Sequence, residues 1–207
     1  MLPGLANTCA IFFLTLIFSL PLGMIFALLH MSKIKVISGI MHFFISILRG
    51  TPLMLQLIAV NFGPWYLFGI SPSREKIIPV VIAFSINYAA YFSEIYRGGI
   101  EAVPVGQYEA ATVLGYSKSQ TFIRIILPQV IKTIIPSVTN EIITLVKDTS
   151  LASTLSFAEM FLIGQQISNS QASFTPLLIA GAFYYVFNYI VTVVMGKVEK
   201  SMSYYQI

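Results

Sequence analysis

Long apolar stretches alternate with short polar ones along this sequence. The apolar stretches cover approximately Thr8–Leu29, Ile37–Phe62, Ile77–Ile95, Phe122–Val146 and Pro176–Met195. Each is close to the ~20 residues that a helix needs to cross the hydrocarbon core of a bilayer, where a helix satisfies its own backbone hydrogen bonds. The pattern therefore predicts an all-α integral membrane protein with five transmembrane helices, built as a single transmembrane domain over residues 1–207.

Composition agrees with a membrane protein and narrows the possible functions. Of the 207 residues, 57% are hydrophobic and 10% are charged, and the mean hydropathy is +0.82, whereas soluble domains carry about a quarter charged residues. The formal charge of +4 comes from scattered basic residues that form no basic face, so nucleic acid is not an expected partner. Cys9 is the single cysteine, and neither His30 nor His42 is spaced with Asp, Glu or Cys as a ligand set, so no metal site is expected.

The basic residues that flank the apolar stretches predict the orientation of the chain in the membrane. With the N-terminus outside and the C-terminus inside, seven basic residues fall on the cytoplasmic side and three on the outer side. The cytoplasmic set is Lys33, Lys35, Arg97, Lys118, Arg124, Lys197 and Lys200, and the outer set is Arg74, Lys76 and Lys147. Because positive residues accumulate on the cytoplasmic side, this orientation is expected. It places the polar segment between the third and fourth spans in the cytoplasm.

That polar segment, Glu101–Pro128, has the features of two short helices. Gln107–Leu114 is rich in good helix formers, and Gly115 suits the turn after a helix, where the backbone φ angle is positive. Ser117 or Ser119 then caps the next helix, which leads into the fourth span. An ordinary solvated loop is the simple alternative. A pair of helices, however, has a shape that fits the cleft of a partner protein.

Four polar residues inside the spans are candidates for a solute pathway. Ionisable residues in a span are costly unless they line a cavity or have partners, and Glu94 and Glu141 are such residues. Asn87 and Tyr91 lie four apart on one helix face and offer neutral donors and acceptors. Structural alternatives stay open: Glu94 as a partner of a nearby arginine, Glu141 in an interhelical hydrogen bond, and Tyr91 in packing. Asn87 with Glu141 is the pair that best suits a solute site.

The second apolar stretch is interrupted by Arg49-Gly50-Thr51-Pro52. Pro52 removes one backbone hydrogen bond from a helix and Gly50 loosens it, so a helix kink is expected at this point. Arg49 either extends to the membrane surface or pairs with a carboxylate. For these four residues, a structural kink is preferred to direct contact with a solute.

Several separated motifs resemble those of a known family. Glu109-Ala110-Ala111, Gly115 and Ile126-Leu127-Pro128 resemble the EAA loop of bacterial ABC importer permeases. Three further stretches resemble the branch that imports polar amino acids, namely Arg49-Gly50-Thr51-Pro52-Leu53, Ser93–Ile100 and Leu145–Leu151. The motifs occur in the expected order and cover nearly the whole chain. The sequence is therefore identified as a member of this family.

The resemblance implies a machine of several chains in a bacterial cell membrane. A second permease chain, identical or related, completes the pathway of a dimer, and an extracytoplasmic solute-binding protein delivers a polar amino acid. Each permease chain docks on one of two cytoplasmic ATP-binding subunits through its coupling residues, Glu109, Ala110, Ala111 and Gly115. The exterior loop Ser168–Thr175 is a candidate contact for the binding protein.

Lys147-Asp148-Thr149-Ser150 follows directly after the fourth span. In an arbitrary membrane protein, these residues are a solvated helix end. The resemblance instead implies a role in gating or packing along the pathway, for which Asp148 and Thr149 are the candidates.

The chain itself is expected to bind no cofactor and to catalyse no reaction. It contains no GxxxxGK[ST] phosphate-binding stretch, so ATP and Mg²⁺ belong to the partner ATPase, and its His, Cys and Asp residues form no catalytic cluster. Three alternatives stay open: a permease for another small polar solute, a passive pore, and a membrane anchor without transport. A passive pore leaves the docking segment unexplained.

Overall fold

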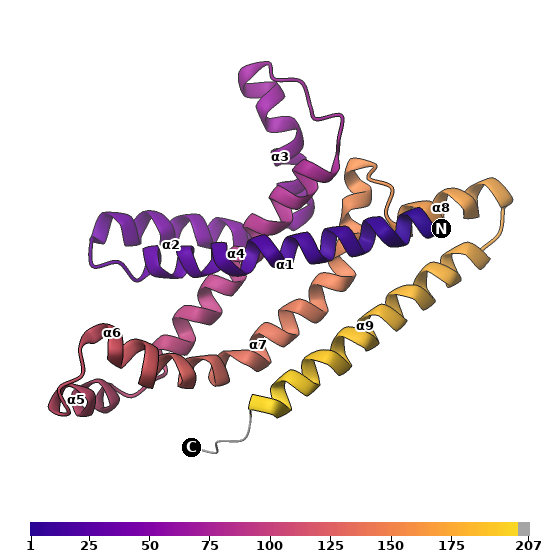
Figure 1. Ribbon diagram of the computed structural model, residues 1–207. Helices are drawn as coiled ribbons and strands as arrows, with labels where there is room; N and C mark the ends of the chain where they lie inside the picture. The colour runs from indigo at the N-terminus through magenta and orange to yellow at the C-terminus, as the bar shows by residue number, and fades with distance from the viewer. Residues whose placement is uncertain (203–207) are drawn as a thin grey trace.

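The computed structural model describes residues 1–202, so the last five residues of the predicted domain lie outside it. Every described element is helical (Figure 1). The α-helices are α1 (Leu2–His30), α2 (Lys35–Gly50), α3 (Leu53–Phe68), α4 (Ile77–Glu101), α5 (Val105–Val113), α6 (Lys118–Thr121), α7 (Leu127–Asp148), α8 (Met160–Gln171) and α9 (Thr175–Met202). A π-helical turn, Phe122–Ile126, joins α6 to α7, and a 3₁₀-helix, Thr149–Leu155, follows α7.

Four helical stretches are long and apolar enough to cross a membrane. They are α1, α4, α9 and the stretch Lys118–Leu155, which contains α7. The bent pair α2 and α3 makes a fifth span if its two halves are counted together. Some helices extend beyond the predicted ends, from Thr8 back to Leu2 in α1 and from Met195 on to Met202 in α9. The all-helical architecture is therefore the one that the apolar pattern predicts.

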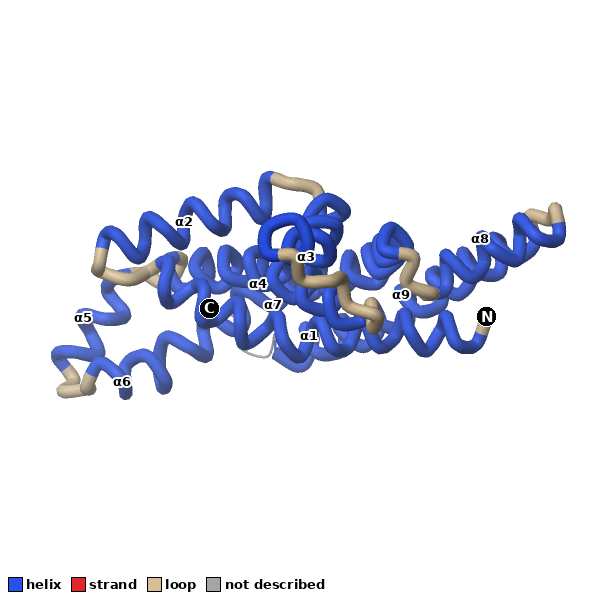
Figure 2. The backbone as a smooth tube through the Cα atoms, turned by 90° about the horizontal axis from the view of Figure 1, so that it is seen from above, coloured by secondary structure: helices blue, strands red, loops and turns tan. Residues whose placement is uncertain are grey.

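Helix α4 forms the centre of the molecule. It packs against α1, α2, α3 and α7 (Figures 1 and 2). Its side chains Phe84, Tyr88 and Phe92 are almost completely buried and share one core with Ile11 and Phe12 of α1. Because lipid tails are as apolar as these side chains, close packing rather than escape from water holds such helices together.

Gly23 sets the close approach of α1 to α4. A Cβ atom built on this residue would lie 2.8 Å from the Cβ atom of Phe92 and 3.1 Å from the carbonyl oxygen of Ala89. One of these contacts is with the backbone of α4, so it cannot be relieved by a change of rotamer. Small residues at helix crossings let the backbones approach and gain van der Waals contact in membrane proteins. Gly23 has that role here.

The second span is not the single kinked helix that the sequence predicts. α2 and α3 are separate helices that meet at 111°, and the far end of α3 projects from the rest of the molecule (Figure 1). Thr51 and Pro52 are extended, with ψ of 147° and 133°, because a proline disfavours helical backbone before it and cannot donate its own backbone hydrogen bond. The expected kink at Arg49-Gly50-Thr51-Pro52 is therefore a complete break. After it the helix continues to Phe68, beyond the predicted end at Phe62.

Helix α8 lies in a region where the sequence predicts an exterior loop, Ser168–Thr175. The helix begins at Met160 and continues to Gln171, so only a short turn remains before α9. Glu159 caps its first turn, because the carboxylate accepts hydrogen bonds from the backbone N–H groups of Phe161 at 2.6 Å and Leu162 at 2.7 Å. The predicted loop is therefore shorter than expected, because residues 168–171 form the last turn of α8 and only residues 172–174 connect it to α9.

Glu159 also ties α8 to its neighbours. Its side chain is completely buried and accepts a hydrogen bond from the Tyr184 hydroxyl of α9 at 2.8 Å. In α1, the Thr8 hydroxyl oxygen accepts a hydrogen bond from the backbone N–H of Met160 at 3.1 Å. Burial raises the pKa of the Glu159 carboxyl, and the hydrogen bonds from Phe161 and Tyr184 act in the opposite direction. Helices α1, α8 and α9 are thus joined by hydrogen bonds around the buried Glu159 side chain.

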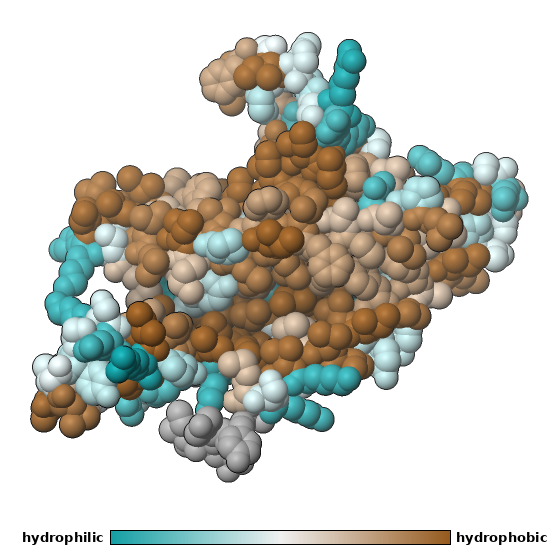
Figure 3. All heavy atoms as spheres, in the orientation of Figure 1, coloured by the Kyte–Doolittle hydropathy of each residue, from teal (hydrophilic) through white to brown (hydrophobic). Residues whose placement is uncertain are grey.

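The surface is apolar along the helices and polar at their ends. In Figure 3, hydrophobic atoms cover the middle of the molecule, and hydrophilic atoms gather over α5 and α6, at the connection after α3, and over α8. Large apolar side chains on the outer faces of the helices are exposed, among them Ile17 of α1, Phe62 of α3 and Val186 of α9. This distribution is typical of a helical membrane protein.

Candidate functional site

The polar segment between α4 and α7 forms the predicted pair of short helices. α5 ends at Val113, and Gly115 has a φ angle of +78°, which confirms the left-handed turn expected at this glycine. Of the two candidate caps, Ser117 is the one that begins α6. Its hydroxyl accepts from the backbone N–H of Gln120 at 3.3 Å, and the Gln120 side chain accepts from the backbone N–H of Ser117 at 2.9 Å. This reciprocal pair fixes the start of α6.

The predicted coupling residues differ in exposure. Three of the four are exposed, namely Glu109, Ala110 and Gly115. The fourth, Ala111, is only 1% exposed and faces the molecule itself. Val113 and Leu114 next to the turn are 87% and 72% exposed. Exposed apolar side chains at the polar end of the molecule are more typical of a contact with another protein than of a solvated face.

An apolar cluster joins the helix pair to the spans. Val103, Ile126 and Val130 are buried together, and Tyr108 and Phe122 pack against them. The cluster therefore combines side chains from α5, from the π-helical turn and from α7. Such turns inside helices occur frequently at functional sites. The cluster therefore places α5 in contact with the start of α7.

A cavity of about 370 Å³ lies between α4 and α7, beside the break between α2 and α3. Four of the six predicted pathway residues line it, namely Asn87, Tyr91, Glu141 and Asp148. Thr51 and Pro52 of the break also border it. The structure does not bring Glu94 or Thr149 into this lining. Thr149 is completely buried, and its hydroxyl donates to the carbonyl of Val146 at 2.7 Å.

The acidic residues of the cavity lie on one face of α7. Glu141, Thr144 and Asp148 are three and four residues apart, and all three line the cavity. Tyr88 of α4 donates its hydroxyl to the Asp148 carboxylate at 2.8 Å. Within the described chain, no lysine or arginine is among the lining residues. A cavity lined by two carboxylates is suited to a positively charged group, such as an ammonium.

Asn87 connects α4 to the helix break. Its amide donates to the carbonyl of Leu48 at 3.2 Å and to Oε1 of Gln56 at 3.1 Å. Gln56 donates in turn to the carbonyls of Leu48 at 2.8 Å and Thr51 at 3.2 Å. The last carbonyls of α2 lack helical partners because the helix ends at Gly50. The two side-chain amides take the place of the missing N–H donors.

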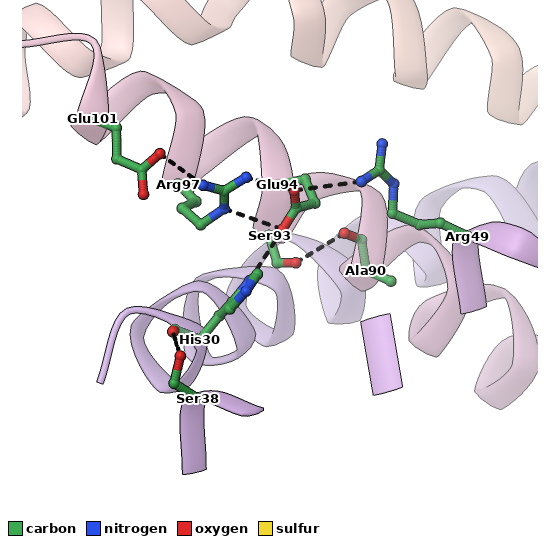
Figure 4. A network of polar contacts seen from close by, with 8 residues as sticks. All are labelled: His30, Ser38, Arg49, Ala90, Ser93, Glu94, Arg97 and Glu101. Carbon is green, nitrogen blue, oxygen red and sulfur yellow. Dashed lines mark hydrogen bonds and ion pairs between the residues drawn. The ribbon is translucent and has the colours of Figure 1, made fainter. Parts of the chain in front are cut away.

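Glu94 is the centre of a charged cluster at the ends of α1, α2 and α4 (Figure 4). Arg97 donates to its carboxylate from Nε at 3.3 Å and from Nη2 at 2.9 Å, and it also binds Glu101 at 2.7 Å. His30 Nδ1 lies 3.1 Å and Arg49 Nη1 lies 3.4 Å from the same carboxylate. These contacts match the structural alternative for Glu94, in which it is a partner of nearby arginines.

Two residues of the site do not follow from the sequence. Gln56 has a role only because the break exposes carbonyl groups, and His30 meets Glu94 only because α1 and α4 pack together. The one available signal for Gln56 is its position shortly after Pro52. Among residues 1–202, no group of three His, Cys, Asp or Glu side chains is arranged to hold a metal ion.

The helical architecture, the polar cavity among the spans and the exposed helix pair define a membrane transport component. Residues 19–204 match the family described as "Binding-protein-dependent transport system inner membrane component", and the chain belongs to this family. It is 36% identical over 205 residues to the L-cystine transport system permease protein TcyB of Bacillus subtilis (strain 168), covering 98% of this chain and 86% of that protein. It is also 36% identical over 204 residues to the arginine transport system permease protein ArtQ of the same organism, covering 98% and 92%.

A solved structure has the same architecture. The crystal structure of an amino acid ABC transporter with histidines matches with a TM-score of 0.87 and 33% sequence identity. The match covers 97% of this chain and 92% of that chain. The fold of this chain is therefore that of an ABC transporter permease, a multi-pass protein of the inner membrane.

Proposed function

We propose that this chain is the transmembrane permease subunit of an ATP-driven importer of polar amino acids. The observation that carries the proposal is the acidic cavity set among the spans, with Asn87, Glu141 and Asp148 in its lining. The relatives named above are permease proteins for L-cystine and for arginine, both of which are polar amino acids. A carboxylate-lined cavity suits the ammonium group that every amino acid carries.

In this proposal the solute passes between α4 and α7. Glu141 and Asp148 attract its ammonium group, and Tyr91 contributes a wall of the cavity. Asn87 acts less as a direct ligand than as the support of the helix break, since its amide N–H donors are engaged by Leu48 and Gln56. The remaining predicted pathway residues, Glu94 and Thr149, act through packing and ion pairs next to the pathway.

The helix pair α5 and α6 couples this chain to an ATPase. The exposed residues Glu109, Ala110 and Gly115 make the contact, and the apolar side chains of Val113 and Leu114 extend it. Ala111 supports the pair from its buried side. When ATP brings two ATPase subunits together, the pair moves, and the contact between α5, the π-helical turn and α7 passes the movement to the cavity wall.

The topology in this proposal has five spans, with the N-terminus outside and the C-terminus inside. The charge bias of the connections supports it, as does the position of the polar helix pair at one end of the spans and α8 at the other (Figure 1). The partners are a second permease chain, two cytoplasmic ATP-binding subunits and an extracytoplasmic solute-binding protein. ATP and Mg²⁺ bind to the ATPase, and this chain supplies no cofactor site.

The proposal is tested by reconstituting the chain with its ATPase and its binding protein in lipid vesicles. ATP hydrolysis and solute accumulation are measured with L-arginine, L-cystine and L-glutamine, and with a sugar of similar size. Polar amino acids are expected to accelerate hydrolysis and to accumulate only when ATP is present. Acceleration by the sugar alone would replace the proposed substrate class with another small polar solute.

A further inference from the structure

Arg49, at the end of α2, has hydrogen-bonding capacity that the protein does not use. Its Nη1 lies 3.4 Å from a Glu94 oxygen, which is an ion pair without a hydrogen bond, and its side chain is 42% exposed. Its guanidinium lies over the ring of Tyr91, 5.5 Å from the ring centroid. Among the described residues, none accepts a hydrogen bond from Arg49. Its N–H donors are therefore available to a ligand.

Glu94 has hydrogen-bond and ion-pair contacts that do not involve Arg49. Arg97 binds the Glu94 carboxylate through two hydrogen bonds, and His30 lies 3.1 Å from it. Figure 4 shows Arg97 and Arg49 approaching Glu94 from opposite sides. Arg49 can thus move to another anion while Glu94 keeps a partner, which avoids the cost of an unpaired charge in the membrane.

The position of Arg49 complements the acidic cavity. Arg49 lines a second cavity of about 300 Å³ next to Glu94, and Tyr91, which carries its guanidinium, lines the cavity of Glu141 and Asp148. The carboxylates of the cavity are negatively charged, and the positively charged guanidinium of Arg49 lies over the ring of Tyr91 in the cavity lining. These charges are opposite to those of an amino acid, whose ammonium is positive and whose carboxylate is negative.

We propose that Arg49 binds the α-carboxylate of the transported amino acid while Glu141 and Asp148 face its ammonium group. The inference rests on the proposed function, because it requires that an amino acid enters the cavity. A guanidinium presents a planar fork of N–H groups that matches both oxygens of a carboxylate. Glu94 holds this fork at the cavity edge until the solute replaces it. Arg49 is thus the residue that distinguishes amino acids from simple amines.

The test measures binding to the purified complex of permease and ATPase without the binding protein, since the binding protein has a selectivity of its own. The probes are the amino acid that best accelerates ATP hydrolysis and its carboxamide, for example L-arginine and L-argininamide. Wild-type protein is expected to bind the acid about tenfold or more tightly than the amide, as charge-assisted hydrogen bonds predict. Arg49→Gln brings this ratio close to one, and Arg49→Lys lowers it in part. Lys35→Gln, an exposed charge removal on the same helix, leaves the ratio unchanged.

The outcomes separate this inference from the proposed function. An Arg49→Gln complex that keeps the wild-type ratio overturns the role of Arg49. If that variant does not assemble, Arg49→Lys decides, because it keeps the charge and lacks the planar fork: a lower ratio supports the role and an unchanged ratio overturns it. A wild-type complex that imports the amino acid with ATP but binds acid and amide equally overturns the carboxylate contact alone. Failure of ATP-driven import in the wild type overturns the proposed function.

Discussion

Two kinds of residue determine how this protein packs and what its cavity attracts. Gly23 allows α1 to approach α4 so closely that a methyl group has no room. Glu141 and Asp148 keep acidic side chains in a cavity whose lining has no lysine or arginine. The first kind of residue contributes to close packing, and in the proposed function the second contributes to the choice of solute, so substitutions at the two should change different measurements.

Gly23→Ala is expected to destabilise the protein. The new methyl group would lie 2.8 Å from the Phe92 Cβ atom, and overpacking of this kind costs about 1–3 kcal/mol. Thermal unfolding of the purified chain in detergent measures the effect. Gly39→Ala is the matched control, because nothing lies within 4 Å of a Cβ atom at Gly39 of α2. Equal melting temperatures for the two variants would contradict the close crossing of α1 and α4.

Glu141→Gln is expected to weaken the uptake of a cationic amino acid more than that of a neutral one. Removal of the carboxylate removes its attraction for the additional positive charge, which at a short distance in a partly buried site corresponds to about tenfold or more. Initial uptake rates of L-arginine and L-glutamine in the reconstituted complex measure the difference. Glu75→Gln, at an exposed position after α3, controls for the loss of a charge. An equal decrease for both solutes counts against a Glu141 side chain that faces the pathway.

At the scale of helices, the α5–α6 pair and α8 each depend on a few residues at their ends. The pair α5 and α6 depends on the positive φ angle of Gly115 and on the cap of Ser117. Helix α8 depends on Glu159, which is buried between α1, α8 and α9. In each case one or two residues at the helix ends fix the local geometry of the element.

Gly115→Val is expected to uncouple transport from ATP hydrolysis. A β-branched residue at a φ angle of +78° is strained by about 1–3 kcal/mol, so the angle between α5 and α6 changes. Binding of the ATPase to the permease in detergent is expected to weaken and uptake to fall, while insertion into the membrane continues. Gly106→Ala in α5 serves as the control, since open space surrounds that glycine. Normal ATPase binding by the Gly115→Val protein would show that the turn is not part of the contact.

Glu159→Ala is expected to release α8 from its neighbours. The substitution removes the cap of the helix, which is worth about 0.5–2 kcal/mol, and leaves the partly buried Tyr184 hydroxyl without its 2.8 Å acceptor. Hydrogen exchange of the α8 backbone should accelerate more than that of α4. Glu199→Ala on α9 provides a comparison at an exposed carboxylate. Unchanged exchange in α8 would mean that other contacts hold it.

For the whole molecule, the apolar stretches predicted the helical class and the positions of the main spans, because bilayer thickness limits the length of a span. They did not predict the 111° angle at Thr51 and Pro52, since hydrophobicity contains no information about the direction of a chain after a break. They also missed α8, whose capping residue Glu159 gains its partners from α9 only after folding.

The candidate site was predictable to a similar degree. Glu141 was identified because ionisable residues inside spans are costly, Asn87 because it offers neutral donors and acceptors on a span, and Asp148 through the family resemblance; the structure brings all three to one cavity. Glu94 satisfied the same criterion but lies in a cluster with Arg97 and His30 instead. The difference depends on which residues meet across α1 and α4, and sequence spacing does not contain that information.

Vesicles that contain this chain alone are expected to show no flux of amino acids. In the proposed function, α5 and α6 couple the chain to an ATPase, so opening of the pathway requires the movement that the ATPase supplies. Radiolabelled L-arginine trapped inside such vesicles measures the leak, with empty vesicles as the control. Flux without ATP or partner chains would favour the passive pore.

The helix break between α2 and α3 also affects how the protein responds to substitution. It turns the carbonyl oxygen of Leu48 toward Asn87 and Gln56, so part of the polarity beside the cavity belongs to the main chain. A scan that replaces side chains one by one leaves this acceptor in place at Leu48 itself. Only a change in the path of the backbone removes the Leu48 carbonyl from this position, and Pro52 is the residue whose substitution would change that path. Relatives with different side chains here retain the same acceptor as long as the chain breaks at this place.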